Sequence, residues 1–158
     1  MTEPIAIAAV ALPGTNVFAR PWTLDLGLPD FAAVRHEDIG PAVRAGMAVQ
    51  RSEWEAVASD EAEPTIANTV EALERSGELL DRVLTVLRTL TSATHCPDLD
   101  ELEEALAPEL SAHIDAYDLD TRLYRRFKAL DGLVRAARET GAEPVDADGA
   151  PIDEQTAR

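Results

Sequence analysis

Residues 64–83 read PTIANTVEALERSGELLDRV, and this stretch decides the fold. Thr65 follows Pro64 and is a suitable N-cap for a helix. Apolar residues then return at alternating steps of four and three as far as Thr91, which is the heptad pattern of a helix buried along one side. A second apolar series begins at Leu79. A helix that is apolar on two sides packs between neighbours, so the pattern predicts a long, unbroken central helix.

Gly77 lies on the buried side of this predicted helix. A glycine inside a helix costs roughly 1 kcal/mol relative to alanine. Either the backbone of a neighbouring element approaches closely here, which we favour, or the helix bends. On the exposed stripe, Glu71 with Arg75 and Glu78 with Arg82 have the spacing of ion pairs that keep a helix soluble.

Three further helices are predicted around the central one, which gives an all-α fold of about four long helices. The first has Asp38 as its cap and Pro41 in its first turn, and one polar residue, Gln50, interrupts its apolar face. Pro108 should kink or split the third helix, because its ring clashes with the carbonyl four residues earlier. The predicted spans are 39–58, Asp98–Tyr117 with Asp98 as cap, and Asp120–Gly141 with Asp120 as cap.

The two ends of the chain lack a helical period. Residues 1–38 are interrupted by proline and glycine and predict an extended N-terminal arm. We expect its apolar residues to lie as a strap over the helical body: Trp22, Leu24, Leu26, Leu28 and Phe31. Residues 141–158 are rich in proline, glycine and acids and predict a loose tail. The predicted organisation is therefore an arm (1–38), a helical domain (39–140) and a tail (141–158).

Composition excludes several classes of function. The chain has 158 residues and a formal net charge of -16, from 30 acidic and 14 basic residues. Such a surface repels nucleic-acid phosphates and anionic lipids, and acids surround the densest basic group, Arg122, Arg125 and Arg126. We therefore expect neither nucleic-acid nor membrane binding. Cys96 is the single cysteine, so no disulfide can form within the chain.

The first residues contain one apolar run, IAIAAVAL (5–12). A signal peptide needs positive charge before such a run, but Glu3 precedes it and the first basic residue is Arg20. The run is also too short to cross a bilayer, which takes roughly 20 residues. The expected location is the cytoplasm.

The sequence shows no active site of its own. It contains no HExxH zinc motif and no glycine-rich phosphate loop. His36 is better explained as a polar residue near a helix start, and His95 as one at a helix end. His113 and Asp115 point apart on a helix, and the acidic run 98–104 is interleaved with leucines, which is typical of a solvated helix face.

The quoted stretch resembles the N-terminal region of the thimet-oligopeptidase-like (M3 family) zinc metallopeptidases, and the wording SGELLDR favours the bacterial peptidyl-dipeptidase (Dcp) and oligopeptidase A branch. Segments 28–47, 90–93 and 107–113 resemble the same family, so the likeness runs from about residue 20 to 138. The motif positions, which the resemblance marks as structural, are Pro64, Thr65, Ile66, Asn68, Thr69, Leu73, Glu74, Ser76, Gly77, Glu78, Leu79, Leu80, Asp81 and Arg82.

The resemblance implies a partial neurolysin-like helical domain. In that family the N-terminal helices wall and roof a channel that admits short peptides. The catalytic Zn(II), its HExxH helix and a further glutamate ligand belong to a later part of the chain, so no catalytic or metal-binding residue is expected here. The last residues, PIDEQTAR (151–158), resemble the start of the family's next helix, which suggests a truncated chain. The implied partners are short peptides and the missing catalytic portion, and apolar surface left exposed would favour self-association.

Two other interpretations remain open. The chain could be a stand-alone helical interaction module derived from this fold, if its own helices cover the apolar faces of the central one. It could also be an enzyme in its own right, which would have to rest on three scattered histidines and one cysteine.

Overall fold

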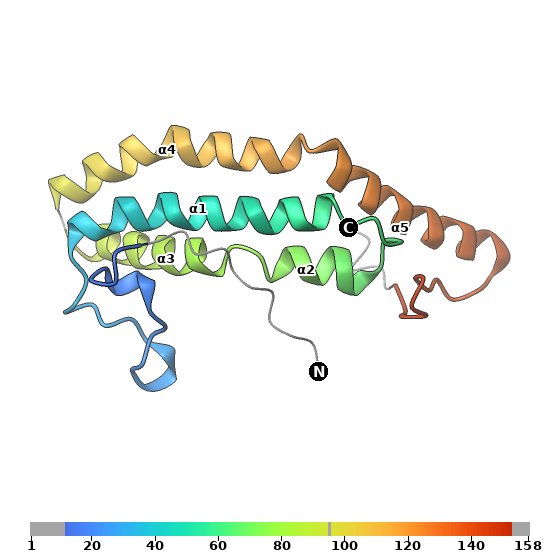
Figure 1. Cartoon of the computed structure of the whole chain (residues 1–158), viewed down its shortest axis with the longest axis horizontal. Helices are drawn as coiled ribbons and strands as arrows, with labels where there is room; N and C mark the ends of the chain where they lie inside the picture. The colour runs from blue at the N-terminus through green and yellow to red at the C-terminus, as the bar shows by residue number, and fades with distance from the viewer. Residues whose placement is uncertain (1–11, 95, 153–158) are drawn as a thin grey trace. The chain divides into compact units, whose positions relative to one another are not determined.

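The computed structural model describes residues 12–94 and 96–152, and these form an all-α protein, as the sequence predicts (Figure 1). Within the described ranges the only strand-like pairing is a single antiparallel bridge between Val145 and Pro151. None of the described helices is long and apolar enough to cross a membrane. The elements are η1 (Val17–Ala19), η2 (Asp25–Gly27), α1 (His36–Ala58), η3 (Ile66–Val70), α2 (Glu71–Glu74), α3 (Glu78–Ala93), α4 (Pro97–Asp118) and α5 (Thr121–Thr140).

The chain divides into two compact units. Among the described residues, unit 1 contains those up to Ser52 together with those of Gly77–Ile114, and unit 2 contains Glu53–Ser76 together with those from Asp115 onward. The motif of residues 64–82 is therefore shared, with 64–76 in unit 2 and 77–82 in unit 1.

The core of unit 1 lies between α1, α3 and α4, which run side by side (Figure 1). Gly46 of α1 permits a close approach to α3, because a Cβ at this position would lie 2.7 Å from the Cα of Leu80. The close backbone contact that we expected at Gly77 is thus made at Gly46. The core consists of Phe18, Ile39, Ala42, Val43, Met47, Leu80, Val83, Val86, Leu87, Leu99 and Leu106.

Unit 2 has two smaller apolar clusters. Val57, Leu73 and Leu123 form one cluster, around which Trp54 and Tyr117 stack with ring centroids 4.9 Å apart. The second cluster joins α5 to η3 and to the end of the described chain, through Leu130, Val134, Ile152, Ile66 and Val70.

The predicted central helix is not continuous. It consists of a π-helical turn η3, a single α-helical turn α2 and the longer α3, with a break at Gly77. Gly77 has φ +80°, the left-handed region that ends a right-handed helix and that glycine adopts without steric cost. The apolar period continues through the break because Leu73 and Leu80 are both buried, each in the core of its own unit. The apolar pattern correctly predicts buried residues such as Leu73 and Leu80. The prediction of one unbroken helix from that pattern is wrong.

The starts of two helices differ from the prediction. α1 begins at His36, so Asp38 lies in its first turn and does not cap it. α4 begins at Pro97, and the backbone carbonyl of Cys96 accepts the first amides, so Asp98 is also inside the helix. Acidic residues in a first turn interact favourably with the positive end of the helix dipole, which explains why both sites attract acids without using them as caps.

Pro108 does not split α4, which is continuous from Pro97 to Asp118. Pro108 and Glu104 are both exposed, so water can bond the carbonyl that the proline leaves unpaired. The predicted limits of α5 are confirmed: the carboxylate of Asp120 accepts from the amides of Arg122 and Leu123, and Gly141 ends the helix with φ +70°.

Only part of the N-terminal arm lies over the helices as predicted. Phe18 is 1% exposed and Trp22 packs against the core of unit 1. The stretch 24–31, which we call the apolar loop, instead exposes Leu24, Leu26, Leu28 and Phe31, and Leu26 is 97% exposed with φ +61°. The strap prediction is wrong for these four residues, because alternation of apolar residues does not distinguish a buried extended segment from an exposed turn. The run at residues 5–11 lies outside the described residues.

The described part of the tail folds back, whereas the sequence suggested a loose segment. Ile152 is 3% exposed and packs against α5. Asp146 is 5% exposed and its carboxylate accepts from the backbone amides of Ile66, Asp148 and Ala150. One buried carboxylate therefore organises a segment whose composition alone indicates disorder.

Candidate functional site

The motif opens with a capping box at the start of η3. The hydroxyl of Thr65 accepts from the amide of Asn68 at 3.1 Å, and the side chain of Asn68 accepts from the amide of Thr65 at 2.7 Å. The side-chain amide of Asn68 also donates to the carbonyl of Glu63 at 2.9 Å. Thr65 and Asn68 are thus motif residues that satisfy backbone groups at a helix start, which confirms Thr65 as the N-cap.

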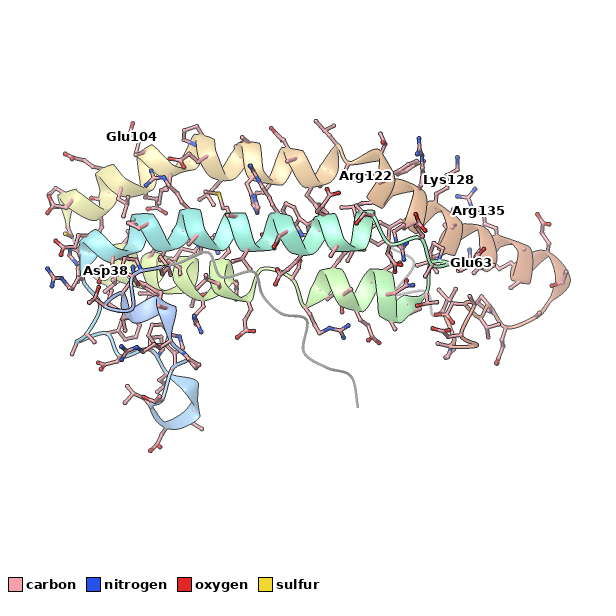
Figure 2. All side chains as sticks on the ribbon, in the orientation of Figure 1. Asp38, Glu63, Glu104, Arg122, Lys128 and Arg135 are labelled. Carbon is pink, nitrogen blue, oxygen red and sulfur yellow. The ribbon has the colours of Figure 1, made fainter. Side chains whose placement is uncertain are left out.

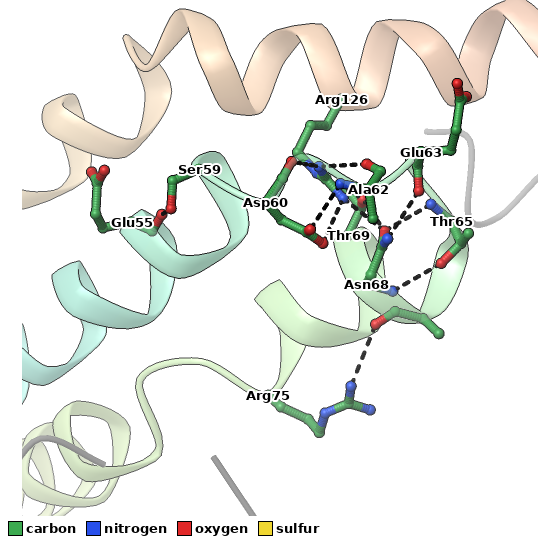
Figure 3. A network of polar contacts seen from close by, with 11 residues as sticks. Glu55, Ser59, Asp60, Ala62, Glu63, Thr65, Asn68, Thr69, Arg75 and Arg126 are labelled. Carbon is green, nitrogen blue, oxygen red and sulfur yellow. Dashed lines mark hydrogen bonds and ion pairs between the residues drawn. The ribbon is translucent and has the colours of Figure 1, made fainter. Parts of the chain in front are cut away.

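The same place receives a buried arginine from α5 (Figure 3). Arg126 is 6% exposed, and its Nε donates to Oγ1 of Thr69 at 3.1 Å. Its Nη1 donates to the carbonyls of Asp60 at 2.7 Å and Ala62 at 3.3 Å. Its Nη2 donates to Oδ1 of Asn68 at 2.8 Å and lies 3.4 Å from the carboxylate of Asp60.

The guanidinium of Arg126 has five N–H groups and five acceptors, so all of its donors are used within unit 2. Most of these acceptors are neutral oxygens, and the one carboxylate is at the long end of the range. Such an arginine holds the loop 59–64 and η3 against α5. With its donors already occupied, it is poorly suited to bind an anionic ligand.

The three arginines that the sequence groups together have different environments. Arg122 is bound to Glu55 and Asp120 at 2.7 and 2.8 Å, and these contacts lower the pKa of both carboxyl groups and raise that of Arg122. Arg126 is buried, and Arg125 is exposed. Further along α5, Lys128 and Arg135 point outward from the ribbon (Figure 2). These side chains do not form one basic patch.

Ser76 ends the part of the motif that lies in unit 2. Its hydroxyl donates to the carbonyl of Leu73 at 2.6 Å and accepts from Nε1 of Trp54 at 3.1 Å. Leu73 is buried beside Trp54 in the unit's apolar cluster. Ser76 therefore ends α2 and at the same time satisfies the one polar atom of a half-buried tryptophan.

Gly77 opens the part of the motif in unit 1, and a side chain of α1 occupies the space above it. A Cβ at Gly77 would lie 2.0 Å from Nε2 of Gln50. The Oε1 of Gln50 lies 2.7 Å from Nε2 of His113, which is 2% exposed on α4. The polar gap that the sequence shows in the first helix is therefore filled by a histidine from another helix.

His113 is held as a neutral imidazole. Its Nδ1 accepts from Nε of Arg51 at 3.2 Å, so the proton lies on Nε2, which donates to Gln50. Burial, and secondly the positive charge of Arg51, lower the pKa of His113 below its usual value. A neutral histidine with both ring nitrogens bonded inside the protein is a structural side chain.

The remaining motif residues have structural positions. Leu80 is buried in unit 1, Leu79 packs at the edge of the same core, and Pro64 is half-buried. Glu71 pairs with Arg75 as predicted. The expected pair of Glu78 and Arg82 is not formed, because Arg82 donates instead to the carbonyl of Phe18 at 2.8 Å. The exposed motif residues are Glu74, Glu78 and Asp81.

Within residues 12–94 and 96–152, no group of three or more His, Cys, Asp or Glu side chains could hold a metal ion. The structure brings a cysteine and a histidine together that are distant in the sequence: Sγ of Cys96 lies 3.7 Å from Nδ1 of His36. Sequence reasoning missed this pair because the two residues are 60 positions apart. The neighbour that it did consider, His95, lies outside the described residues.

Sequence comparison relates the chain to bacterial peptidases. It is 35% identical over 116 residues to a dipeptidyl carboxypeptidase of Salmonella typhimurium, and 34% identical over 115 residues to a dipeptidyl carboxypeptidase of Escherichia coli. Each match covers 73% of this chain and 17% of the relative. An oligopeptidase A of Salmonella typhimurium is 27% identical over 110 residues, which is 70% of this chain and 16% of that protein. No family profile matches the chain.

The chain is related to a segment of these peptidases. The resemblance drawn from the motif is thereby confirmed at the level of dipeptidyl carboxypeptidases and oligopeptidase A. The chain spans about a sixth of the length of the curated relatives that it matches. For that segment, the structure shows an all-α fold in which Thr65, Asn68 and Ser76 make local hydrogen bonds, whereas Arg82 bonds the distant carbonyl of Phe18.

Proposed function

We propose that this chain forms a wall and gate of the peptide channel in a zinc-dependent oligopeptidase of the thimet-oligopeptidase-like family, and that it contributes no chemistry of its own. The observation that carries the proposal is the match of 35% and 34% identity to two dipeptidyl carboxypeptidases over 73% of the chain. The substrates of the whole enzyme would be short peptides. Its Zn(II) would be held by residues of another part of the enzyme, and its location would be the cytoplasm.

The use of the motif supports a scaffolding role. Thr65, Asn68 and Ser76 bond backbone or side-chain groups of unit 2, and Arg126 uses all of its donors there. Gly77 supplies a left-handed turn beside Gln50. Residues committed to internal contacts in this way are suited to a rigid wall.

The partner of this segment would be the remainder of the peptidase. The apolar loop offers four large apolar side chains, of which Leu26 is 97% exposed. A leucine in the left-handed region is uncommon and costs roughly 1–2 kcal/mol, and such strain often marks a functional contact. We place the contact with the catalytic portion at this loop.

One observation favours a second candidate, a stand-alone helical interaction module. The apolar residues of the motif helix do not need a foreign partner, because Leu73, Leu80, Val83 and Leu87 are already buried within this chain. A domain that covers its own central helix can fold and act alone. Its binding surface would then be the apolar loop, with a protein as the ligand.

A cleavage assay tests the absence of chemistry. The purified chain is incubated with short peptides and Zn²⁺, with the Escherichia coli dipeptidyl carboxypeptidase as the positive control. We expect cleavage in the control and none with the chain. Cleavage by the chain that a chelator abolishes would contradict the proposal.

A segment exchange tests the scaffolding role. The 115 matched residues of the Escherichia coli enzyme are replaced by those of this chain, and peptide cleavage and thermal unfolding are measured. An active chimera supports a wall segment. The zinc-free enzyme gives the background rate of cleavage. A chimera that folds but cleaves no faster than this background would favour the stand-alone module.

A further inference from the structure

Residues 13–22 of the arm, which we call the strap, cover the core of unit 1 without joining its helices by backbone pairing. Their backbone hydrogen bonds are local, from Asn16 to Pro13, from Ala19 to Asn16 and from Arg20 to Val17. The strap nevertheless contributes Phe18, which is 1% exposed and belongs to the unit's main core cluster. In the described part of the chain, the deeply buried side chain of Phe18 therefore comes from a segment whose backbone makes no hydrogen bonds to the backbone of the helices that it covers.

Within the described ranges, two hydrogen bonds tie the strap to the helices. Nδ2 of Asn16 donates to the carbonyl of Asp38 at the start of α1, at 3.0 Å. Nη2 of Arg82 donates from α3 to the carbonyl of Phe18, at 2.8 Å. Both bonds use a side chain of one partner, so the loss of one side chain removes one tie completely.

Arg82 makes a second contact with the strap. Its guanidinium carbon lies 5.5 Å from the ring centroid of Trp22, a cation–π distance. The ring of Trp22 in turn meets that of Phe18 edge-on, with centroids 5.6 Å apart. One guanidinium therefore holds both the carbonyl of the buried phenylalanine and the aromatic ring that covers it.

The contact of Arg82 carries a penalty that limits its strength. Its Nε is buried and has no hydrogen-bond partner. A buried donor without a partner costs about 1–3 kcal/mol, and more when the group is charged. Release of the strap would let water reach this atom, so the penalty favours the open form and partly offsets the contacts with Phe18 and Trp22.

We propose that the strap is a lid that opens as a unit while α1, α3 and α4 stay folded, and that Arg82 of the SGELLDR motif is its latch. Opening withdraws Phe18 and exposes to water the apolar core side chains that it covers. This assigns a conformational role to a motif residue whose predicted role was an ion pair with Glu78. The inference rests on contacts within the chain and is independent of the proposed peptidase function.

Hydrogen exchange measured by mass spectrometry on the full chain tests the lid. The amides of Phe18, Ala19 and Arg20 are hydrogen-bonded within one short 3-10 turn of the strap. So short a turn does not persist once it leaves the core, so these amides exchange when the strap opens. We expect them to exchange through an opening whose rate changes little with added urea, because a local opening exposes little surface. The amides of α1 and α3 should exchange only through an opening with strong urea dependence. Equal urea dependence in the strap and in the helices would overturn the proposal.

The latch is tested with Arg82→Met, which keeps an apolar stem and removes the donors. Strap amides should exchange about tenfold faster, because the lost hydrogen bond and cation–π contact outweigh the relieved penalty at Nε. The amides of α1 should be unchanged. Arg88→Met, at an exposed position of α3, is the matched control. It should change neither the exchange of the strap amides nor that of the α1 amides. If Arg82→Met fails to fold, Asn16→Ala removes the other tie. It must then raise exchange at Ala19 and Arg20 and leave the helices unchanged; Phe18 is left out, because its amide is bonded to the Asn16 side chain itself. Faster exchange in the strap and helices together, or an unchanged strap, would refute the latch.

Discussion

Arg126 illustrates at the residue scale how a buried charge can organise a loop. Its donors bond Thr69, Asn68 and the carbonyls of Asp60 and Ala62. Removing the guanidinium deletes these bonds, which join α5 to the loop 59–64 and to η3. We therefore expect Arg126→Met to lower the free energy of unfolding by about 3 kcal/mol, measured by urea titration.

The neighbouring arginine provides the control. Arg125 is exposed and makes no contact of this kind, so Arg125→Met should change stability by less than about 0.5 kcal/mol. Equal effects of the two substitutions would mean that the hydrogen bonds of Arg126 do not stabilise unit 2.

His113 predicts a pH dependence. Its pKa is lowered in the folded chain by burial and by Arg51, so the folded state binds a proton less readily than the unfolded state does. The contribution of neutral His113 to the free energy of unfolding is therefore fully present above about pH 6.5, the usual pKa of a histidine. It is lost as the pH falls below that value. We expect urea stability to decline between pH 7 and pH 5, and His113→Asn to flatten this slope.

The control for this slope is His36→Asn, at an exposed histidine. This substitution should leave the slope between pH 7 and pH 5 in place. A slope that survives in His113→Asn would assign the pH dependence to other groups.

Sequence reasoning located residues at this scale better than it located their partners. The caps at Thr65 and Asp120 follow from a local rule and are confirmed. The link between Gln50 and His113 joins residues 63 positions apart, and that between Arg126 and Asn68 joins residues 58 apart. Such pairs depend on how helices pack, which no local pattern encodes.

At the scale of elements, Gly77 is the position where the structure most changes the interpretation of the motif. The apolar period around it is real, but the glycine has φ +80° and contacts Gln50. The period predicts which residues are buried, whereas the conformation of one glycine decides whether a helix continues. A period of three and four is therefore compatible with one long helix or with two shorter ones.

A pair of glycine substitutions tests this break. Gly77→Ala places a Cβ 2.0 Å from Gln50 in a left-handed conformation, and should lower the free energy of unfolding by at least about 2 kcal/mol. Gly132→Ala, inside α5 with nothing within 4 Å of the new Cβ, should raise it by roughly 0.5–1 kcal/mol. Thermal unfolding measures both. A stabilised Gly77→Ala would show that the helix is continuous in solution.

At the scale of the whole molecule, charge and exposed apolar area act in opposite directions. A net charge of -16 makes copies of the chain repel one another. The apolar loop, with Leu26 at 97% and Leu28 at 55% exposure, favours association. Salt screens the repulsion, with a Debye length that falls from about 10 Å at 0.1 M to about 3 Å at 1 M, and leaves apolar attraction intact.

The chain should therefore be monomeric at low salt and associate at about 1 M NaCl, as measured by light scattering after size-exclusion chromatography. Leu26→Asp combined with Leu28→Asp should abolish this association, because it places charge at its centre. Leu119 is 78% exposed elsewhere in the chain, and Leu119→Asp, which adds charge outside the loop, should leave most of the association in place. If all variants associate alike, the contact lies elsewhere, and the apolar loop loses its assignment as the docking surface for the rest of the peptidase.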